Sequence, residues 1–135
     1  MSTPTKPAKM ALVVHADMGV LSAFQISLVS CGYVVILARD LPTALLATTQ
    51  HFFDLAIISS LLAEGGDGWP LAGVLHLVFP QAFVGVLTPE TSVLTLQSAI
   101  NNGVTQLFDA TSQPSDVVSA VLRDHSEVKQ KRSVH

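Results

Sequence analysis

The fold is decided by the stretch from Met10 to Ala38, which is MALVVHADMGVLSAFQISLVSCGYVVILA. It opens with the apolar run MALVV (10–14), which is too short for a helix and apolar on both faces, as buried parallel strands are. Asp17 can cap a helix that ends at Gly32, and VVILA (34–38) is a second run of the same kind. The helical spacing between the two runs is carried by Leu21, Phe24, Leu28 and Cys31. The stretch therefore predicts a strand–helix–strand unit.

The same alternation of apolar runs and helical segments continues to residue 123. Further strands are expected at Asp54–Ser59, Ala82–Leu87 and Gln106–Asp109. Further helices are expected after the capping residue Asp40, with Pro42 in the first turn, and at Leu71–Val78, Pro89–Asn102 and Pro114–Arg123. Thr88 can cap the helix that starts at Pro89, and Gly103 can end it. Five strands alternating with five helices predict an α/β fold, a three-layer α/β/α sandwich around a parallel sheet.

Length and composition predict a single domain with two short extensions. At 135 residues the chain has the usual size of one compact domain. We expect a disordered lead over residues 1–9, the domain over residues 10–123 and a charged tail over residues 124–135. Every apolar run is interrupted well before the ~20 residues of a spanning helix, and the N-terminus does not resemble a signal peptide. We therefore expect a cytoplasmic protein without a membrane segment, in which the single Cys31 forms no internal disulfide.

Charge is scarce in this sequence, and its sign argues against one class of partner. Charged residues make up 13% of the chain, about half the usual quarter, and the formal net charge is −3. Between Lys9 and Arg123 the only cation is Arg39. The acidic residues in the same interval are Asp17, Asp40, Asp54, Glu64, Asp67, Glu90, Asp109 and Asp116. An acidic body repels a phosphate backbone, so we expect no nucleic-acid binding.

Five motifs of the chain resemble those of response-regulator receiver domains. LVVHAD (12–17) is similar to the family's strand that ends in an acidic pair, and DLAIIS (54–59) to the strand that ends in the phosphate-accepting aspartate. GGDGWPL (65–71) resembles the turn into the third helix, with about one extra residue in the loop, and VGVLT (84–88) ends at the threonine position. The segment 103–114 resembles the one that holds a lysine followed by proline. The resemblance covers residues 10–123 and implies a flavodoxin-like sheet of order 2-1-3-4-5 and a role in two-component signalling.

At the positions that carry phosphotransfer in the family, this sequence departs from the pattern. The acidic pair that would hold magnesium falls on His15 and Ala16, and the acceptor aspartate falls on Ser59. The lysine falls on Ala110 and the switch aromatic on Leu107, whereas Thr88 is retained. Magnesium needs carboxylate ligands, and a serine needs an activating base to act as a nucleophile. The resemblance therefore implies a stand-alone pseudo-receiver that is not an enzyme, binds no cofactor and has lost its magnesium site.

Other interpretations of the same strand ends stay open at this stage. Parallel α/β sheets place their functional crevice at the carboxyl ends of the strands, where Asp109 also falls. An enzyme or small-ligand-binding protein could use an altered crevice of His15, Ser59 and Thr88. His15 with Asp17 could be a metal pair or a pH-sensitive pair, although two ligands without a third make a metal site improbable. Trp69 could be an exposed binding anchor or a cover for the third helix.

Low charge on the expected helices predicts an interaction surface. The helix from Met18 to Ser30 has no charged residue, and the one from Pro89 to Asn102 has only Glu90. Burying neutral polar groups costs less than burying an unpaired charge. We therefore expect a homodimer or a signalling partner to dock on the fourth helix, fifth strand and fifth helix, the surface that the family commonly uses for pairing. The candidate residues are Thr91, Thr95, Ser98 and Asn102, and the first helix with Gln25, Ser27 and Ser30 is the competing surface.

Overall fold

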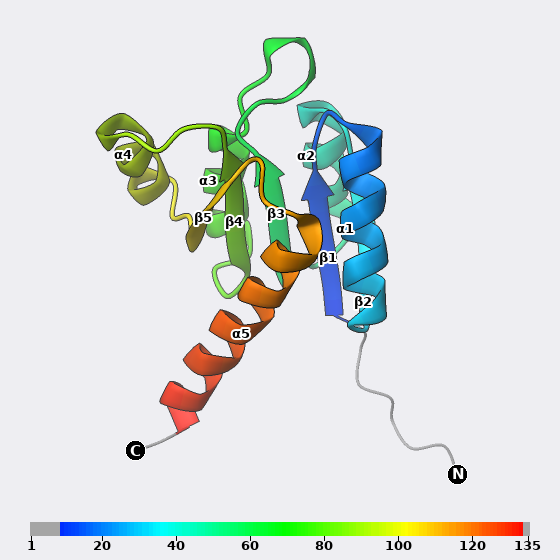
Figure 1. Cartoon of the computed structure of the whole chain (residues 1–135), viewed down its shortest axis with the longest axis vertical. Helices are drawn as coiled ribbons and strands as arrows, with labels where there is room; N and C mark the ends of the chain where they lie inside the picture. The colour runs from blue at the N-terminus through cyan, green and yellow to red at the C-terminus, as the bar shows by residue number, and fades with distance from the viewer. Residues whose placement is uncertain (1–8, 134–135) are drawn as a thin grey trace.

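Five parallel strands form the centre of the molecule, in the order β2-β1-β3-β4-β5 (Figure 1). The computed structural model describes residues 9–133, with side chains described up to Arg123. The strands are β1 (Lys9–Val14), β2 (Tyr33–Ala38), β3 (Leu55–Ser59), β4 (Phe83–Thr88) and β5 (Gln106–Asp109). The helices are α1 (Met18–Ser30), α2 (Leu41–Gln50), α3 (Trp69–Val78), α4 (Val93–Asn101) and α5 (Pro114–Ser133), with a 3-10 turn η1 at Ala63–Gly65. The predicted α/β fold and strand order are confirmed.

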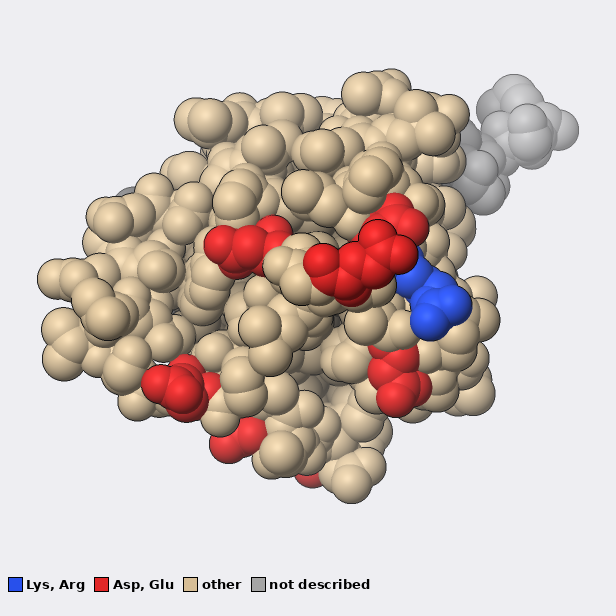
Figure 2. Space-filling view, turned by 90° about the horizontal axis from the view of Figure 1, so that it is seen from above, with Lys and Arg blue, Asp and Glu red and all other residues tan. Residues whose placement is uncertain are grey.

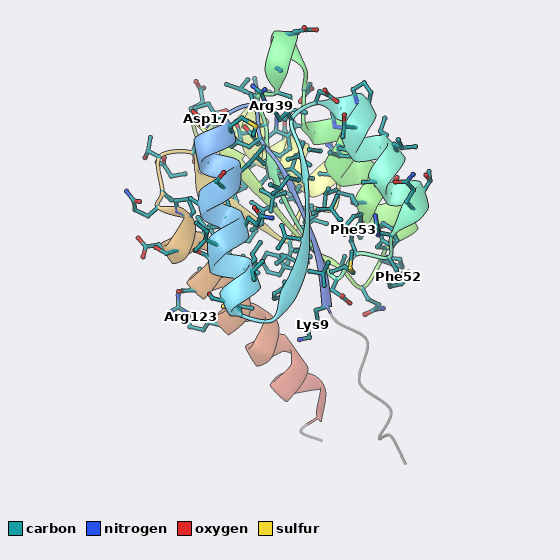
Figure 3. The ribbon with its side chains drawn as sticks, turned by 90° about the vertical axis from the view of Figure 1, so that its right-hand side faces the viewer. Lys9, Asp17, Arg39, Phe52, Phe53 and Arg123 are labelled. Carbon is teal, nitrogen blue, oxygen red and sulfur yellow. The ribbon has the colours of Figure 1, made fainter. Side chains whose placement is uncertain are left out.

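The helices form one layer on each face of the sheet, as the view along the sheet edge shows (Figure 3). One core cluster joins α1 and α5 to the sheet, and a second joins α2 and α3 to the other face. In β1, Val13 belongs to the first cluster, while Leu12 and Val14 belong to the second. Each buried aliphatic side chain stabilises the fold by about 1.5–3 kcal/mol. Strands that are apolar on both faces therefore hold two helix layers.

Three of the predicted helix ends are confirmed by their capping geometry. The Asp17 carboxylate accepts hydrogen bonds from the backbone N–H groups of Gly19 (2.7 Å) and Val20 (3.2 Å) at the start of α1. Asp40 accepts one from the N–H of Thr43 (2.9 Å) in the first turn of α2. Gly32, just after α1, has a φ of 92°, in the left-handed region where glycine carries no steric cost.

The fourth helix begins later than the sequence predicts. It starts at Val93 rather than Pro89, and its N-cap is Ser92, whose hydroxyl accepts from the N–H of Thr95 (3.2 Å). Thr88 is the last residue of β4, and its hydroxyl donates to the carbonyl of Glu90 (3.0 Å). The prediction that Thr88 caps this helix was therefore wrong, because a serine four residues further on provides the capping oxygen.

The two ends of the chain differ in how far the structure tests their predicted boundaries. The lead predicted over residues 1–9 lies outside the described residues, except that Lys9 begins β1. At the other end α5 runs on to Ser133, so the backbone of most of the predicted charged tail continues the last helix. No proline or glycine follows Pro114 in this segment, and Lys, Glu and Gln are good helix formers. Within the described residues, no helix is both long and apolar enough to cross a membrane.

Candidate functional site

The carboxyl ends of β1, β3, β4 and β5 meet at one edge of the sheet, which is the face seen in Figure 2. Val14 pairs with Ile58, so the residues after β1 come next to the end of β3. Ser59 pairs with Leu87, one residue before the end of β4. The edge thereby brings together the predicted site residues His15, Ala16, Ser59, Thr88 and Ala110.

His15 is half-buried and uses one ring nitrogen within the chain. Its Nδ1 accepts a hydrogen bond from the backbone N–H of Asp17 (3.0 Å), which leaves the ring proton on Nε2. The Asp17 carboxylate in turn accepts from the first turn of α1. Burial lowers the pKa of His15, and the nearby Asp17 charge opposes this only in part. The two side chains are therefore held as a backbone-capping pair, with the imidazole favoured in its neutral form.

Arg39, directly after β2, is the cation of this face. Its Nε and Nη2 donate to the carbonyl of Ala16 at 3.2 and 3.0 Å. Figure 3 labels Arg39 near Asp17 at the upper end of the molecule, whereas Lys9 and Arg123 are labelled at the lower end. Figure 2 shows a single blue patch among several red ones on this face. Arg39 therefore ties the loop after β1 to β2, a role that its place in the sequence did not suggest.

Two buried serines, not one, lie at the end of β3. The Ser59 hydroxyl donates to the carbonyl of Leu61 (2.7 Å) and accepts from its N–H (3.3 Å), in a local turn. The Ser60 N–H donates to the carbonyl of Leu87 (2.9 Å), which extends the β3–β4 pairing by one residue. Ser60 is 5% exposed, and the hydrogen bonds described for it are made by its backbone. Sequence reasoning missed Ser60, although a second serine directly after the strand was the available signal.

The loop between β3 and α3 closes tightly over the end of β3. The N–H of Gly68 donates to the carbonyl of Ser60 (3.0 Å), and Leu61 and Asp67 form an isolated antiparallel bridge. A Cβ at Gly68 would lie 2.1 Å from the carbonyl oxygen of Ser59, which leaves no room for a side chain there. Beyond the bridge the loop projects from the carboxyl edge, at the top of Figure 1. The Gly-rich segment therefore serves close backbone packing rather than an open cradle.

The ends of β4 and β5 are also engaged within the chain. The Thr88 hydroxyl is buried and bonded to Glu90. The Asp109 carboxylate accepts from the N–H (2.8 Å) and the hydroxyl (2.6 Å) of Thr111, and these bonds lower its pKa. Ala110 is exposed and offers only a methyl group, and Leu107 is half-buried against the core cluster of α2 and α3.

The residues at this edge do not fit a magnesium site. Magnesium requires several oxygen ligands in near-octahedral geometry, usually including carboxylates. Two carboxylates beside the strand ends, Asp17 and Asp109, are bonded to backbone and threonine groups, and the Ala16 side chain has no ligand atom. In the described part of the chain, no three His, Cys, Asp or Glu side chains lie close enough to hold a metal ion.

Trp69 lies half-buried against the core of α2 and α3, as the covering interpretation predicted.

The candidate interface residues of α4 lie differently from what their polarity suggested. Thr91 is exposed, but Thr95, Ser98 and Asn102 are half-buried. Thr95 bonds the cap residue of the helix, and the Asn102 amide donates to the carbonyl of Ser98 (2.8 Å). Several exposed positions of α4 are instead apolar: Val93 (71%), Leu94 (74%) and Ile100 (77%), with Leu96 at 46%. Only Ala99 of this helix is buried, so α4 has its large apolar side chains outside.

Comparison with known proteins identifies the architecture. No family model matches the chain, and no curated protein matches it in sequence. A response regulator receiver domain (CheY-like) from Methanospirillum hungatei JF-1 is 22% identical with a TM-score of 0.81, over 92% of this chain and 98% of that one. A response regulator from Burkholderia pseudomallei, solved with a phosphorylated aspartic acid and calcium, is 22% identical with a TM-score of 0.77, over 93% and 74%.

A third structure supports the same assignment. The signal receiver domain of an HD domain-containing protein from Pseudomonas fluorescens Pf-5 is 21% identical with a TM-score of 0.78, over 99% of this chain and 98% of that one. The chain has the receiver fold. At this level of identity the likeness concerns the fold alone.

Proposed function

We propose that this receiver fold is a pseudo-receiver, which acts in two-component-type signal transduction through phosphorylation-independent protein–protein interaction. The observation that carries the proposal is the state of the carboxyl edge. Among the residues there with oxygen side chains, Ser59, Thr88 and Asp109 are bonded to neighbours within the chain. Ala16 and Ala110 supply no charge at the edge. This arrangement supports the proposal, because Ala16 and Ser59 supply no carboxylate for magnesium and the Ser59 hydroxyl has no base bonded to it.

The docking surface in this proposal includes the outward side of α4. Val93, Leu96 and Ile100 follow the spacing i, i+3 and i+7, which puts them on one side of a helix. A helix with an apolar stripe of this kind fits an apolar groove on a partner. The partner in this proposal is a signalling protein, and the neutral Thr91 just before the helix adds no charge that would have to be desolvated.

The alternative function, an enzyme or small-ligand site at His15, Ser59 and Thr88, has less support. A nucleophilic serine needs a base within hydrogen-bond reach. The Ser59 hydroxyl is bonded to Leu61, and His15 Nδ1 accepts from the backbone of Asp17. Neither group is available to the other in this arrangement.

The proposal is tested by exposing the chain to a small phosphoryl donor. The full chain is incubated with acetyl phosphate and magnesium, and its intact mass is measured, with a receiver domain that retains the aspartate as positive control. We expect no gain of a phosphoryl group in this chain and complete reaction in the control. A stable gain that disappears in Ser59→Ala or in Ser60→Ala would refute the proposal and identify the acceptor.

A further inference from the structure

Two neighbouring helices, α2 and α3, form a face without charged side chains. No Asp, Glu, Lys or Arg occurs over residues 41–53 or 68–89, which include both helices and the segments that follow them. α2 and α3 pack against each other and share one core cluster. The titratable residues in these two ranges are His51 and His76. Surface helices normally carry charges on their outer side, so this face is unusual.

Large apolar side chains are exposed across the same face. The exposed fractions are 37% for Leu45, 58% for Leu46, 72% for Phe52, 80% for Leu77 and 50% for Val78. Monomeric proteins rarely expose contiguous apolar patches above a few hundred Å². We call these five residues the α2–α3 patch.

The aromatic member of the α2–α3 patch is held in position. The ring of Phe52 lies 5.1 Å from that of Phe79, edge to face at 72°, and Phe79 is itself buried in the core. Figure 3 shows Phe52 at the lower margin of the helix layer, outside Phe53, which is buried. Because the Phe52 ring packs on Phe79 on one side and is exposed on the other, it loses little conformational freedom when a partner covers it.

We propose that the α2–α3 patch binds a second copy of this chain in a two-fold symmetric dimer. A two-fold axis sets each surface against itself, so a charged face would bring like charges together. The α2–α3 patch has no such charge, whereas the carboxyl edge is acidic, as Figure 2 shows, and α5 carries Asp116 and Arg123. The first helix is also uncharged, but it packs beside α5, which restricts the neutral area around it.

The available area corresponds to a weak dimer. A buried aliphatic side chain removes roughly 60–120 Å² from water and an aromatic one about 150–250 Å². With the exposed fractions above, the α2–α3 patch supplies on the order of 350 Å² of apolar surface per chain. A standard interface needs about 800 Å² per partner, of which about 65% is apolar in homodimers. The neutral residues around the patch, Thr49, Gln50 and Pro80 among them, provide part of the remainder, and we expect an interface at the small end of the range.

This inference goes beyond the proposed function and uses a different surface. The outward stripe of α4, with Leu96 and Ile100, is not part of the α2–α3 patch. The phosphoryl-transfer experiment does not depend on dimer formation, so either proposal can fail without the other.

The test is the mass of the full chain in solution as a function of concentration. Sedimentation equilibrium should show a monomer that converts to a dimer as concentration rises, and Leu77→Glu should weaken the dimer at least about tenfold by burying an unpaired charge. Phe52→Ser removes apolar surface from the same patch without adding a charge, and it should also weaken the dimer. The matched control is Ile26→Glu on α1, because Ile26 is 72% exposed on the opposite helix layer.

Each other result overturns the inference. A monomer at every concentration excludes the dimer. A dimer that survives both Leu77→Glu and Phe52→Ser does not use the α2–α3 patch. Disruption by Ile26→Glu alone would assign the contact to α1, and disruption by Ile100→Glu alone would assign it to α4. Circular dichroism of each variant confirms that its fold is intact.

Discussion

The carboxyl edge of the sheet and the outer face of α2 and α3 are opposite in character. At the edge, polar side chains are bonded to their own neighbours, as Ser59 is to Leu61 and Thr88 to Glu90. On the helix face, large apolar side chains such as Leu77 are exposed, and residues 41–53 and 68–89 contain no charged residue. In an α/β fold the edge is where a ligand site is expected. In this chain it is the helix face that exposes large apolar side chains.

The comparison shows that charge is distributed differently in the two regions. At the edge, carboxylates are present, but those of Asp17 and Asp109 are bonded to groups within the chain. On the helix face, the absence of charged side chains lowers the desolvation cost of covering the surface. Unsatisfied polarity does not mark the edge either. Among the described residues, the one fully buried side-chain N or O atom without a hydrogen bond is the Tyr33 hydroxyl, which lies at the amino end of β2.

The largest expected effect tests whether the edge is closed. Gly68→Ala should lower the free energy of unfolding by about 3 kcal/mol, because the new methyl group would collide with the carbonyl of Ser59. The matched control is Gly65→Ala. Gly65 has a φ of 75° but open space around it, so its substitution should cost only about 1–2 kcal/mol. Urea unfolding of both variants measures the difference, and equal losses would mean that the loop does not pack on β3 as described.

A smaller effect tests what the carboxylate next to the edge does. Asp17→Ala should lower the free energy of unfolding by about 1 kcal/mol, because α1 loses its N-cap. Asp17→Asn, which keeps a capping oxygen, should cost much less. Both losses should be the same with and without magnesium in thermal or urea unfolding. If magnesium stabilised the wild-type chain more than the two variants, the loss of stability would be larger with magnesium than without it. That result would identify Asp17 as a metal ligand and contradict the capping role.

The sheet and most helix ends could be predicted because their causes are local. Runs such as MALVV (10–14) are apolar on both faces, and only a strand covered on both sides buries them fully. Asp17 and Asp40 are short acceptors directly before helical spacing begins, and both cap as expected. The start of α4 was missed because Pro89 and Ser92 are both good start signals, and the sequence does not say which one the backbone uses.

The site could be predicted only in part, because its decisive contacts are not local. Arg39 donates to the carbonyl of Ala16, which lies 23 positions away in the sequence, and no sequence motif predicts that hydrogen bond. The pair of serines could have been predicted, since Ser59 ends the strand and Ser60 follows it directly. The polar residues around α4 predict its outward side wrongly, because Thr95 and Asn102 are half-buried while Ile100 is exposed. A chain with so few charges gives little indication of which helix face meets solvent.

The smallest expected effect concerns the pH dependence of the edge. Burial lowers the pKa of His15 below its ordinary value of about 6.5, although the Asp17 carboxylate pulls it upward. A histidine whose pKa is lower in the folded state binds fewer protons there than in the unfolded chain. Its contribution to stability is therefore complete above pH ~6.5 and is lost as the pH falls below that value.

The wild-type chain should accordingly lose more stability than His15→Asn when the pH is lowered from about 7.5 to about 5.5. Asparagine keeps an acceptor near the N–H of Asp17 but does not titrate, so it isolates the histidine from the other titrating groups. Urea unfolding at a series of pH values, at constant ionic strength, gives the difference between the two proteins. If the wild-type chain instead became more stable relative to His15→Asn as the pH fell, the Asp17 charge would outweigh burial. His15 would then be held as a charged imidazolium, and the neutral form inferred from its burial would be wrong.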